Sequence, residues 1–337
     1  MRRPRFLPDN FTIALIVCVV AASLIPCRGY LAITLNWITS LAIGLLFFLH
    51  GGKLSREAII AGATNWRLHL LVMVCTFGLF PILGVGLRPL LSPLVHSELY
   101  VGVLFLCTLP STVQSSIAFT SMAKGNVPAA VCAASASSML GIFVTPALVG
   151  LVMIDRAASG TSAWHTVGNI VIQLLVPLVA GQLLRPAIGG WIDGHKPVTR
   201  AVDQGSILLV VYVAFSEAVN EGIWHNTSIK TLIGLVIVNA ILFTLVLLIT
   251  ATTSKLLGFS REDQITIVFC GSKKSLASGI PMAKVIFATK AGAVVLPLML
   301  FHQIQLMVCA VLAQRWGAEE RRGALEASTT APERVED

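Results

Sequence analysis

The chain has 337 residues, of which 55% are hydrophobic and only 12% are charged, and its mean hydropathy is +0.84. A soluble domain carries charge on about a quarter of its residues, so this composition predicts a membrane protein and excludes a soluble enzyme or a nucleic-acid-binding protein. The seven cysteines lie singly, without a Cys-x-x-Cys pair or a Cys/His cluster. That pattern argues against a disulfide framework and against a zinc site.

Apolar runs along the chain predict ten membrane-spanning helices, because a bilayer core needs about 20 apolar residues per helix. The tail at residues 315–337, rich in Ala, Glu and Arg, is predicted to be disordered. A cleaved signal peptide over residues 1–27 is the alternative for the first span, although Pro26 fits a cleavage site poorly. The predicted spans are residues 10–26, 31–50, 68–87, 99–122, 127–153, 165–188, 203–222, 230–257, 263–287 and 291–314.

The basic residues orient these spans. With the N-terminus inside, 16 of the 24 Lys and Arg residues fall in cytoplasmic segments and 6 fall outside. Because cytoplasmic loops carry the excess of Lys and Arg, both termini are predicted to be cytoplasmic. The two remaining basic residues, Lys273 and Lys274, lie within the ninth span.

Two segments of the chain share a pattern. The stretch 107–117 aligns without a gap on 270–280 at an offset of 163, and Cys, Ser115/Ser278 and Ile coincide. Each half, residues 1–153 and 165–314, then holds five spans. Because five is odd, the halves cross the membrane in opposite senses, which is the inverted-repeat arrangement of secondary transporters.

The fourth and ninth spans are predicted to be broken near the middle of the bilayer. Pro110 cannot donate to the helical ladder, and residues 271–275 contain no apolar side chain. At about 1.5 Å per residue, each break lies roughly 16 Å into a core of about 30 Å. Unwound backbone is tolerated there only around a cavity or inside protein, and broken helix ends offer N–H groups to anions and carbonyls to cations.

Polar residues at matching depth are the candidates for binding a solute or a coupling ion. A charge at the bilayer centre costs at least about 2.5–3.5 kcal/mol, so the two lysines are the most informative, and Lys274 is favoured. Structural alternatives stay open: a lysine could pair with Glu217 or lose its proton on burial, and His302 or the serines could serve helix packing. The candidates are Thr112, Gln114, Ser115, Ser116, Ser135, Ser138, Glu217, Ser272, Lys273, Lys274, Ser275, Ser278, His302 and Gln305.

The stretch Phe269–Met282, together with 54–57 and 65–69, resembles the bile-acid sodium symporter superfamily. It is most similar to the branch of bacterial symporter-like proteins that resembles the divergent seventh member of solute carrier family 10. The resemblance implies ten helices in two inverted repeats. Spans 1, 2, 6 and 7 would form a panel, and spans 3–5 and 8–10 a core in which spans 4 and 9 cross.

The same resemblance implies sodium sites behind the crossing and organic anions in the cleft between panel and core. Sodium-coupled members carry a glutamate and a glutamine near the second break, where this chain has Cys270 and Lys274. At least one sodium site is therefore expected to be lost, while Thr112, Gln114 and Ser115 could still supply oxygens to another.

The sequence thus predicts a secondary active transporter of a small organic, anionic solute in a bacterial inner membrane, working by alternating access. A sodium ion or a proton is the expected coupling ion, and no other cofactor is expected. The sequence offers no nucleophile and base pair or metal cluster, so an enzyme is not predicted. A cation/proton exchanger and a non-transporting regulator of ion homeostasis stay open as alternatives, as does the oligomeric state.

Overall fold

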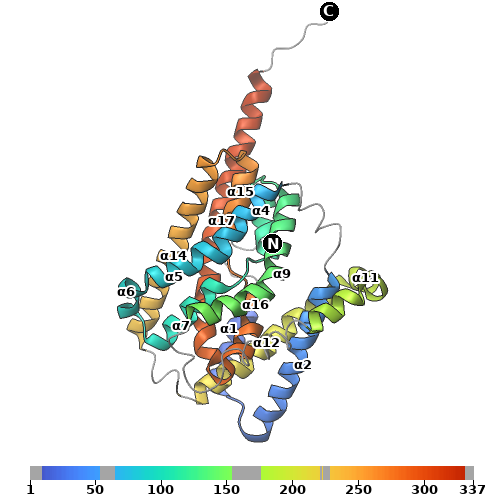
Figure 1. Cartoon of the computed structure of the whole chain (residues 1–337), viewed down its shortest axis with the longest axis vertical. Coiled ribbons are helices and arrows are strands. Elements are labelled where there is room, and N and C mark those ends of the chain that lie inside the picture. The colour runs from blue at the N-terminus through green and yellow to red at the C-terminus, as the bar shows by residue number, and fades with distance from the viewer. Residues whose placement is uncertain (1–9, 54–64, 154–175, 221, 223–227, 331–337) are drawn as a thin grey trace, which may run out of the picture.

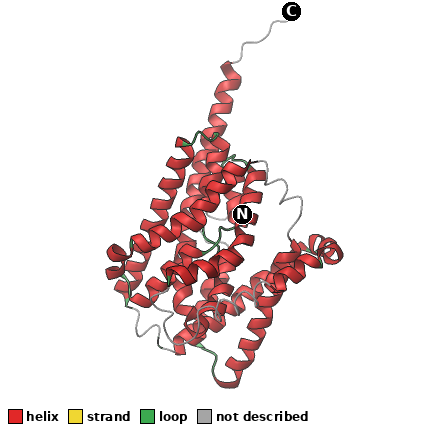
Figure 2. Cartoon of the chain, viewed as in Figure 1, coloured by secondary structure: helices red, strands yellow, loops and turns green. Residues whose placement is uncertain are grey.

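A computed structural model describes residues 10–53, 65–153, 176–220, 222 and 228–330 of the chain. Within these residues every regular element is a helix and none is a strand (Figure 2). Residues 1–9, which bear on the signal-peptide alternative, and the motif at 54–57 lie outside the described residues.

The helices divide at residues 154–175, which the structure does not describe. Before that segment the elements are α1 (Asn10–Leu24), α2 (Gly29–Lys53), α4 (Trp66–Val74), the π-helix η2 (Cys75–Leu79), α5 (Phe80–Gly86), α6 (Arg88–Leu91), the 3-10 helix η3 (Ser92–Leu94), α7 (Ser97–Thr108), α8 (Gln114–Met122) and α9 (Val127–Val152). After it come helical residues 176–183, α11 (Arg185–Gly194), α12 (Lys196–Asn220), α14 (Ile229–Leu256), α15 (Arg261–Gly271), α16 (Leu276–Phe287), the 3-10 helix η5 (Ala288–Lys290) and α17 (Ala291–Thr330).

These helices pack as two groups. In the smaller group α12 packs against α1 and α2, and α11 packs against α2. In the larger group α14 packs against α15 and α17, α15 packs with α4, α8 and α9, and α17 packs with α7 and α8. The contact between the groups runs mainly through α12, which touches α16 and α17. Figure 1 shows α2 and α11 on one side of the molecule, away from α14 on the other.

Six helical stretches are long and apolar enough to cross a membrane, which makes this a polytopic integral membrane protein. They are Gly29–Lys53, Trp66–Gly86, Val127–Val152, Lys196–Asn220, Ile229–Leu256 and Ala291–Glu319, and they match predicted spans 2, 3, 5, 7, 8 and 10. The first predicted span is the 15-residue helix α1. The sixth begins outside the described residues, and the fourth and ninth are interrupted.

The C-terminal tail differs from its prediction. Residues 315–330, predicted to be disordered, continue α17 as a helix that projects beyond the rest of the molecule (Figure 1). Ala, Glu and Arg are strong helix formers, and extending an existing helix avoids the cost of nucleation. The prediction of disorder was therefore wrong for these residues.

Both predicted helix interruptions are present, and they meet. Residues 109–113 separate α7 from α8, and residues 272–275 separate α15 from α16. The backbone N–H of Ser275 donates to the carbonyl of Pro110 at 2.8 Å, which joins the two non-helical stretches. Gly141 of α9 admits this arrangement, because a Cβ there would lie 2.6 Å from the Pro110 ring.

The freed backbone groups around the crossing have partners. The N–H of Ser111 donates to the hydroxyl of Ser137 at 3.0 Å, and the N–H of Ser278 donates to the hydroxyl of Ser275 at 3.2 Å, which caps α16. Unwound chain in the protein interior is tolerated when its polar groups are satisfied in this way. The crossing is therefore held by hydrogen bonds from neighbouring side chains.

Candidate functional site

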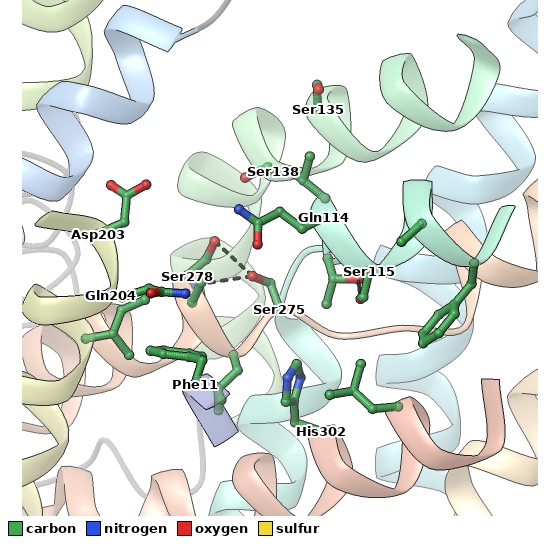
Figure 3. Close-up of a pocket in the computed structure, with 18 of the residues that line it drawn as sticks. Phe11, Gln114, Ser115, Ser135, Ser138, Asp203, Gln204, Ser275, Ser278 and His302 are labelled. Carbon is green, nitrogen blue, oxygen red and sulfur yellow. Dashed lines mark hydrogen bonds between the residues drawn. The ribbon is translucent and has the colours of Figure 1, made fainter. Parts of the chain in front are cut away.

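A cavity of about 1100 Å³ lies between the two helix groups and reaches the crossing. The larger group lines it with both interruptions, the starts of α8 and α16, and parts of α9 and α17, while the smaller group lines it with α2 and α12. Figure 3 shows Gln114, Ser275 and Ser278 gathered in this pocket, with Asp203 and Gln204 of α12 facing them.

Part of the predicted site lines this cavity. The lining residues among the candidates are Thr112, Gln114, Ser115, Ser135, Ser138, Ser275, Ser278 and His302. The remaining candidates, all within the described chain, do not line it and are Ser116, Glu217, Ser272, Lys273, Lys274 and Gln305. The structure therefore separates polar residues that line the cavity from Ser116, Ser272, Lys273, Lys274 and Gln305, which are packed around the crossing, and from Glu217 on α12.

The ammonium group of Lys274 is held in the interior by backbone oxygens. Its side chain is fully buried, and Nζ donates to the carbonyls of Thr76 at 2.7 Å, Cys107 at 2.9 Å and Leu109 at 2.6 Å. These three bonds use every donor of an ammonium group. The Phe80 ring centroid lies 4.1 Å from Nζ and adds a cation–π contact. Two acceptors belong to the C-terminal end of α7, where the helix dipole favours a cation.

The carbonyl of Thr76 is free to accept this bond because of a π-helical turn. In η2 the backbone N–H of Phe80 donates to Cys75. In the same register the carbonyl of Thr76 would receive the N–H of residue 81, but that residue is Pro81 and has none. Pro81 inside an apolar span is the sequence signal that could have predicted this acceptor.

Lys273 is also fully buried but is held more loosely. Its Nζ donates to the hydroxyl of Ser115 at 3.3 Å and lies 4.5 Å and 5.7 Å from the ring centroids of Phe119 and Phe269. In the described chain no carboxylate forms a salt bridge with either Lys273 or Lys274. The structural alternative of a pair with Glu217 is therefore wrong for both lysines.

Two of the residues predicted to supply oxygens to sodium, Thr112 and Ser115, lie in a hydrogen-bonded cluster beside Lys273. Thr112 exchanges hydrogen bonds with Ser115 at 2.7 Å and with Ser116 at 3.0 Å, and Ser115 also accepts from the Lys273 ammonium. A sodium ion at these oxygens would sit beside a like charge. The position implied for a sodium-ligating glutamine is filled by Lys274.

Gln305 and the buried serines hold the crossing in place. The side-chain amide of Gln305 donates to the carbonyl of Lys274 and accepts from its N–H, both at 2.9 Å, and it also donates to His302 Nδ1 at 2.8 Å. The hydroxyls of Ser116 and Ser272 donate to carbonyls in the last turn of α15, those of Phe269 and Val268. These side chains position the backbone around the cavity.

Glu217 forms an ion pair with a lysine that the sequence analysis did not single out. Its Oε2 pairs with Lys284 of α16, and its Oε1 accepts from Asn36 of α2 at 2.9 Å. Both charged side chains are largely buried, with exposures of 17% and 12%. Because Glu217 belongs to α12 and Lys284 to α16, this pair joins the smaller group to the larger one.

The sequence analysis also missed a second ion pair, which lines the cavity. Lys53, at the end of α2, pairs with Asp203 of α12, and His50 lies one turn before Lys53 on the same lining. Arg200 and Arg315 line the same end of the cavity. Charged residues at predicted span ends were assigned to loops, and no local pattern joins Lys53 to Asp203, 150 residues away.

The electrostatics of the cavity favour an anion. Residues 113–115 and 275–278, at the N-terminal ends of α8 and α16, line it. Helix N-termini carry partial positive charge and free N–H groups. Among the described lining residues, Lys53, Arg200 and Arg315 are basic and Asp203 is the only acidic residue.

Comparison with known proteins now places the chain. Residues 9–318 match the model of the SBF-like CPA transporter family. The chain belongs to this family. It is 62% identical to an uncharacterized protein of Pseudomonas aeruginosa over 99% of this chain and 100% of that protein. It is 56% identical to the Escherichia coli protein named "Putative symporter YfeH" over 91% and 92%. It is 30% identical to "Sodium/bile acid cotransporter 7-B" of Xenopus laevis over 91% of each.

Proposed function

We propose that this family member is a secondary active transporter that moves a small organic anion by alternating access. The observation that carries the proposal is the cavity at the crossing, which two helix N-termini and an excess of basic side chains line. A small organic anion would be attracted by the partial positive charge of these helix ends and would accept hydrogen bonds from the hydroxyls of Ser138 and Ser278. The names of the relatives, symporter and sodium/bile acid cotransporter, support a transported organic solute.

Within the described residues, the cavity lining extends from the crossing toward one end of the molecule, as expected of one state of an alternating-access carrier. Its lining runs from the crossing to Lys53, Arg200 and Arg315, which are residues predicted to lie on the cytoplasmic side. On the opposite side α12 lies tight against α17, because a Cβ on Gly292 would be 2.5 Å from the Cβ of Ala218. The Glu217–Lys284 ion pair lies on that side as well. We therefore assign the structure to an inward-facing state.

We further propose ten membrane spans in two inverted repeats. The interrupted pairs α7–α8 and α15–α16 would be the crossing spans 4 and 9. The smaller helix group corresponds to the proposed panel and the larger group to the proposed core, and transport would move one against the other. The distribution of basic residues supports a bacterial inner membrane with both termini in the cytoplasm.

Lys274 would replace a sodium ion in this carrier. Its ammonium has carbonyl oxygens and an aromatic face around it, as a monovalent cation would. A charge that is covalently attached holds the end of α7 against the crossing in every state. Sodium is therefore not expected to be needed for binding.

A ligand screen tests the proposal. Purified protein is heated with succinate, benzoate or taurocholate as N-methylglucamine salts, with mannitol and choline as neutral and cationic controls. A ligand at 100 times its Kd stabilises the native state by about 2.7 kcal/mol. We expect at least one anion to raise Tm equally in sodium and in N-methylglucamine chloride, and proteoliposomes to accumulate it. Stabilisation by the controls alone would contradict an anionic solute.

The same proteoliposomes separate the alternative functions. Sodium- or potassium-driven pH changes without anion uptake would instead indicate a cation/proton exchanger. Absence of flux with every solute would indicate a non-transporting regulator. A sodium requirement for binding would overturn the role given to Lys274 while leaving the transporter in place.

A further inference from the structure

The ion pair inside the cavity suggests how solute binding is coupled to a second species. Lys53 and Asp203 lie on α2 and α12, both in the smaller group, and their side chains are 31% and 19% exposed. Both line the cavity, so an entering anion can reach the Lys53 ammonium. The pair is therefore placed where solute and Asp203 compete for one cation.

The two carboxylates of α12 are held differently. Both oxygens of Glu217 have a partner, Asn36 for one and Lys284 for the other. Asp203 uses Oδ2 for Lys53, whereas its Oδ1 is buried and has no hydrogen-bond partner in the described structure. A buried acceptor without a donor costs free energy. Only one of the two Asp203 oxygens, Oδ2, has a hydrogen-bond donor, the ammonium of Lys53.

Charge balance then decides what happens when an anion binds. The Lys53–Asp203 pair is neutral as a unit. Adding one anionic group beside it leaves two carboxylate-like charges sharing one cation, and in a partly buried site two such groups do not both stay ionised. Neutrality is restored when one proton binds, and the Oδ1 atom of Asp203, which has no hydrogen-bond partner in the described structure, can accept it.

Other charged and titratable groups surround this pair. The elements that pack against α12 include α1, whose Cys18 thiol donates to the carbonyl of Leu208, η5, which carries Lys290, and α16, whose Lys284 is held by Glu217. Four further charged or titratable groups line the same cavity: His50 from α2, Arg200 from α12, and His302 and Arg315 from α17. The first residue of α11, the helix before α12, is Arg185. None of these is acidic, so within the described residues Asp203 is the only carboxylate of the cavity that can take the proton.

We propose that Lys53 and Asp203 form a carboxylate-exchange site: the anionic group of the solute takes the Lys53 ammonium from Asp203, and the released Asp203 carboxylate binds one proton from solution. One proton then accompanies each anionic charge, and the proton and anion leave together when the pair re-forms. This inference rests on the proposed transport of an anion and names its coupling ion and the two residues that carry the coupling.

Proton uptake on binding provides the test. The full-length protein in weakly buffered detergent solution is mixed with succinate, benzoate or taurocholate, and a pH-indicator dye reports protons taken up. Wild type is expected to take up about one proton per carboxylate or sulfonate bound at Lys53. Its Kd is expected to rise about tenfold per pH unit over the range in which Asp203 is ionised in the free protein and protonated in the complex, because one proton is then linked to binding.

Variants distinguish the two residues. Asp203→Asn should bind the anion about tenfold more tightly, since no internal carboxylate competes, and should take up no proton. Lys53→Gln should weaken binding at least tenfold, and Lys53→Arg should restore both binding and proton uptake, which excludes misfolding as the cause. Lys196→Gln is the matched control, because Lys196 is an exposed cation of the same helix, α12, and is not among the residues that line the cavity. It should leave both anion binding and proton uptake close to wild type.

Each outcome decides between the two proposals. Binding by wild type without proton uptake, or unchanged uptake in Asp203→Asn, would overturn the exchange site and leave an anion transporter in place. Unchanged binding in Lys53→Gln would do the same. No binding of any of the three anions would overturn the anionic solute and the exchange site together.

Discussion

The buried lysines of this protein fall into two kinds. Lys273 and Lys274, behind the crossing, have no carboxylate partner in the described chain, and Lys274 is bound by three backbone carbonyls. Lys53 and Lys284, at the two ends of α12, each pair with a carboxylate on that helix. A charge bound by three backbone carbonyls has no side-chain partner to exchange. A charge bound by a side chain can exchange partners, so the moving contacts of the protein lie along α12.

The two α12 pairs also differ from each other. Asp203 and Glu217 are 14 positions apart in one helix, about 21 Å at 1.5 Å per residue. The Lys53–Asp203 pair lies within the smaller group, whereas Glu217–Lys284 joins the two groups. Relative motion of the groups must therefore break the second pair and can leave the first intact.

The largest effect is expected from locking the Glu217–Lys284 contact. A Glu217→Cys/Lys284→Cys double variant, in a chain whose natural cysteines are replaced by alanine, is joined with a short bismaleimide. Uptake of the transported anion into proteoliposomes should be abolished, because the outer side can no longer open. The matched control is Arg28→Cys/Asn220→Cys, a contact at 2.9 Å that involves the same end of α12 but lies within the smaller group. Cross-linking there should spare uptake, and equal inhibition by both would contradict the assignment.

Replacing Lys274 tests whether the backbone-bound charge is structural. Lys274→Met leaves three buried carbonyls without a donor, and removing one member of a buried charged contact costs about 3–5 kcal/mol. Thermal unfolding in detergent should show a large decrease in Tm. Lys290→Met, a lysine on the exposed turn η5, is the control and should change Tm little. A stable Lys274→Met variant that fails only in transport would place this lysine in the transport machinery instead.

Weakening the outer ion pair should shift the balance between states. Lys284→Gln removes the charge that joins α16 to α12, and a loss of about 1.4 kcal/mol changes a population tenfold. Ser138→Cys, on the cavity lining, should then react several-fold faster with a membrane-impermeant maleimide added outside. The charge-reversed double variant Glu217→Lys/Lys284→Glu should return the rate toward that of wild type. If the outside rate stays the same in Lys284→Gln, the pair does not seal the outer side.

The smallest effect is expected at Lys273. Its single hydrogen bond of 3.3 Å and two aromatic contacts are weaker than the contacts of Lys274, so Lys273→Met should cost about 1–2 kcal/mol. The measurement is the decrease in Tm of Lys273→Met compared with that of Lys274→Met. A larger decrease for Lys273→Met would contradict the conclusion that Lys274 contributes more to stability.

The sequence was sufficient for the helix breaks and for part of the cavity. Pro110 and the polar run at 271–275 cause interruptions through local chemistry, and the hydroxyls next to them, such as Thr112 and Ser275, line the cavity as a direct consequence. Local sequence also explains the Ser275 cap of α16. These features depend on residues a few positions apart.

The direction of the lysine side chains could not be predicted in the same way. Lys274 points to carbonyls of Thr76 and Cys107, which are 198 and 167 positions away, so only the packed fold determines its partners. The Lys53–Asp203 pair was missed for the same reason. The sequence pattern predicts Lys284 in an outer segment and leaves Lys273 or Lys274 as the possible partner of Glu217, whereas in the structure Glu217 pairs with Lys284.

The tethered ammonium of Lys274 has an energetic consequence for a carrier. A sodium ion that crosses with its cargo does electrical work, about 2.3 kcal/mol for one charge and 100 mV. The charge of Lys274 is part of the chain and returns to its starting point after every cycle, so its net work is zero. Loss of a sodium site would thus lower the steepest concentration gradient that the carrier can build from the sodium gradient and the membrane potential.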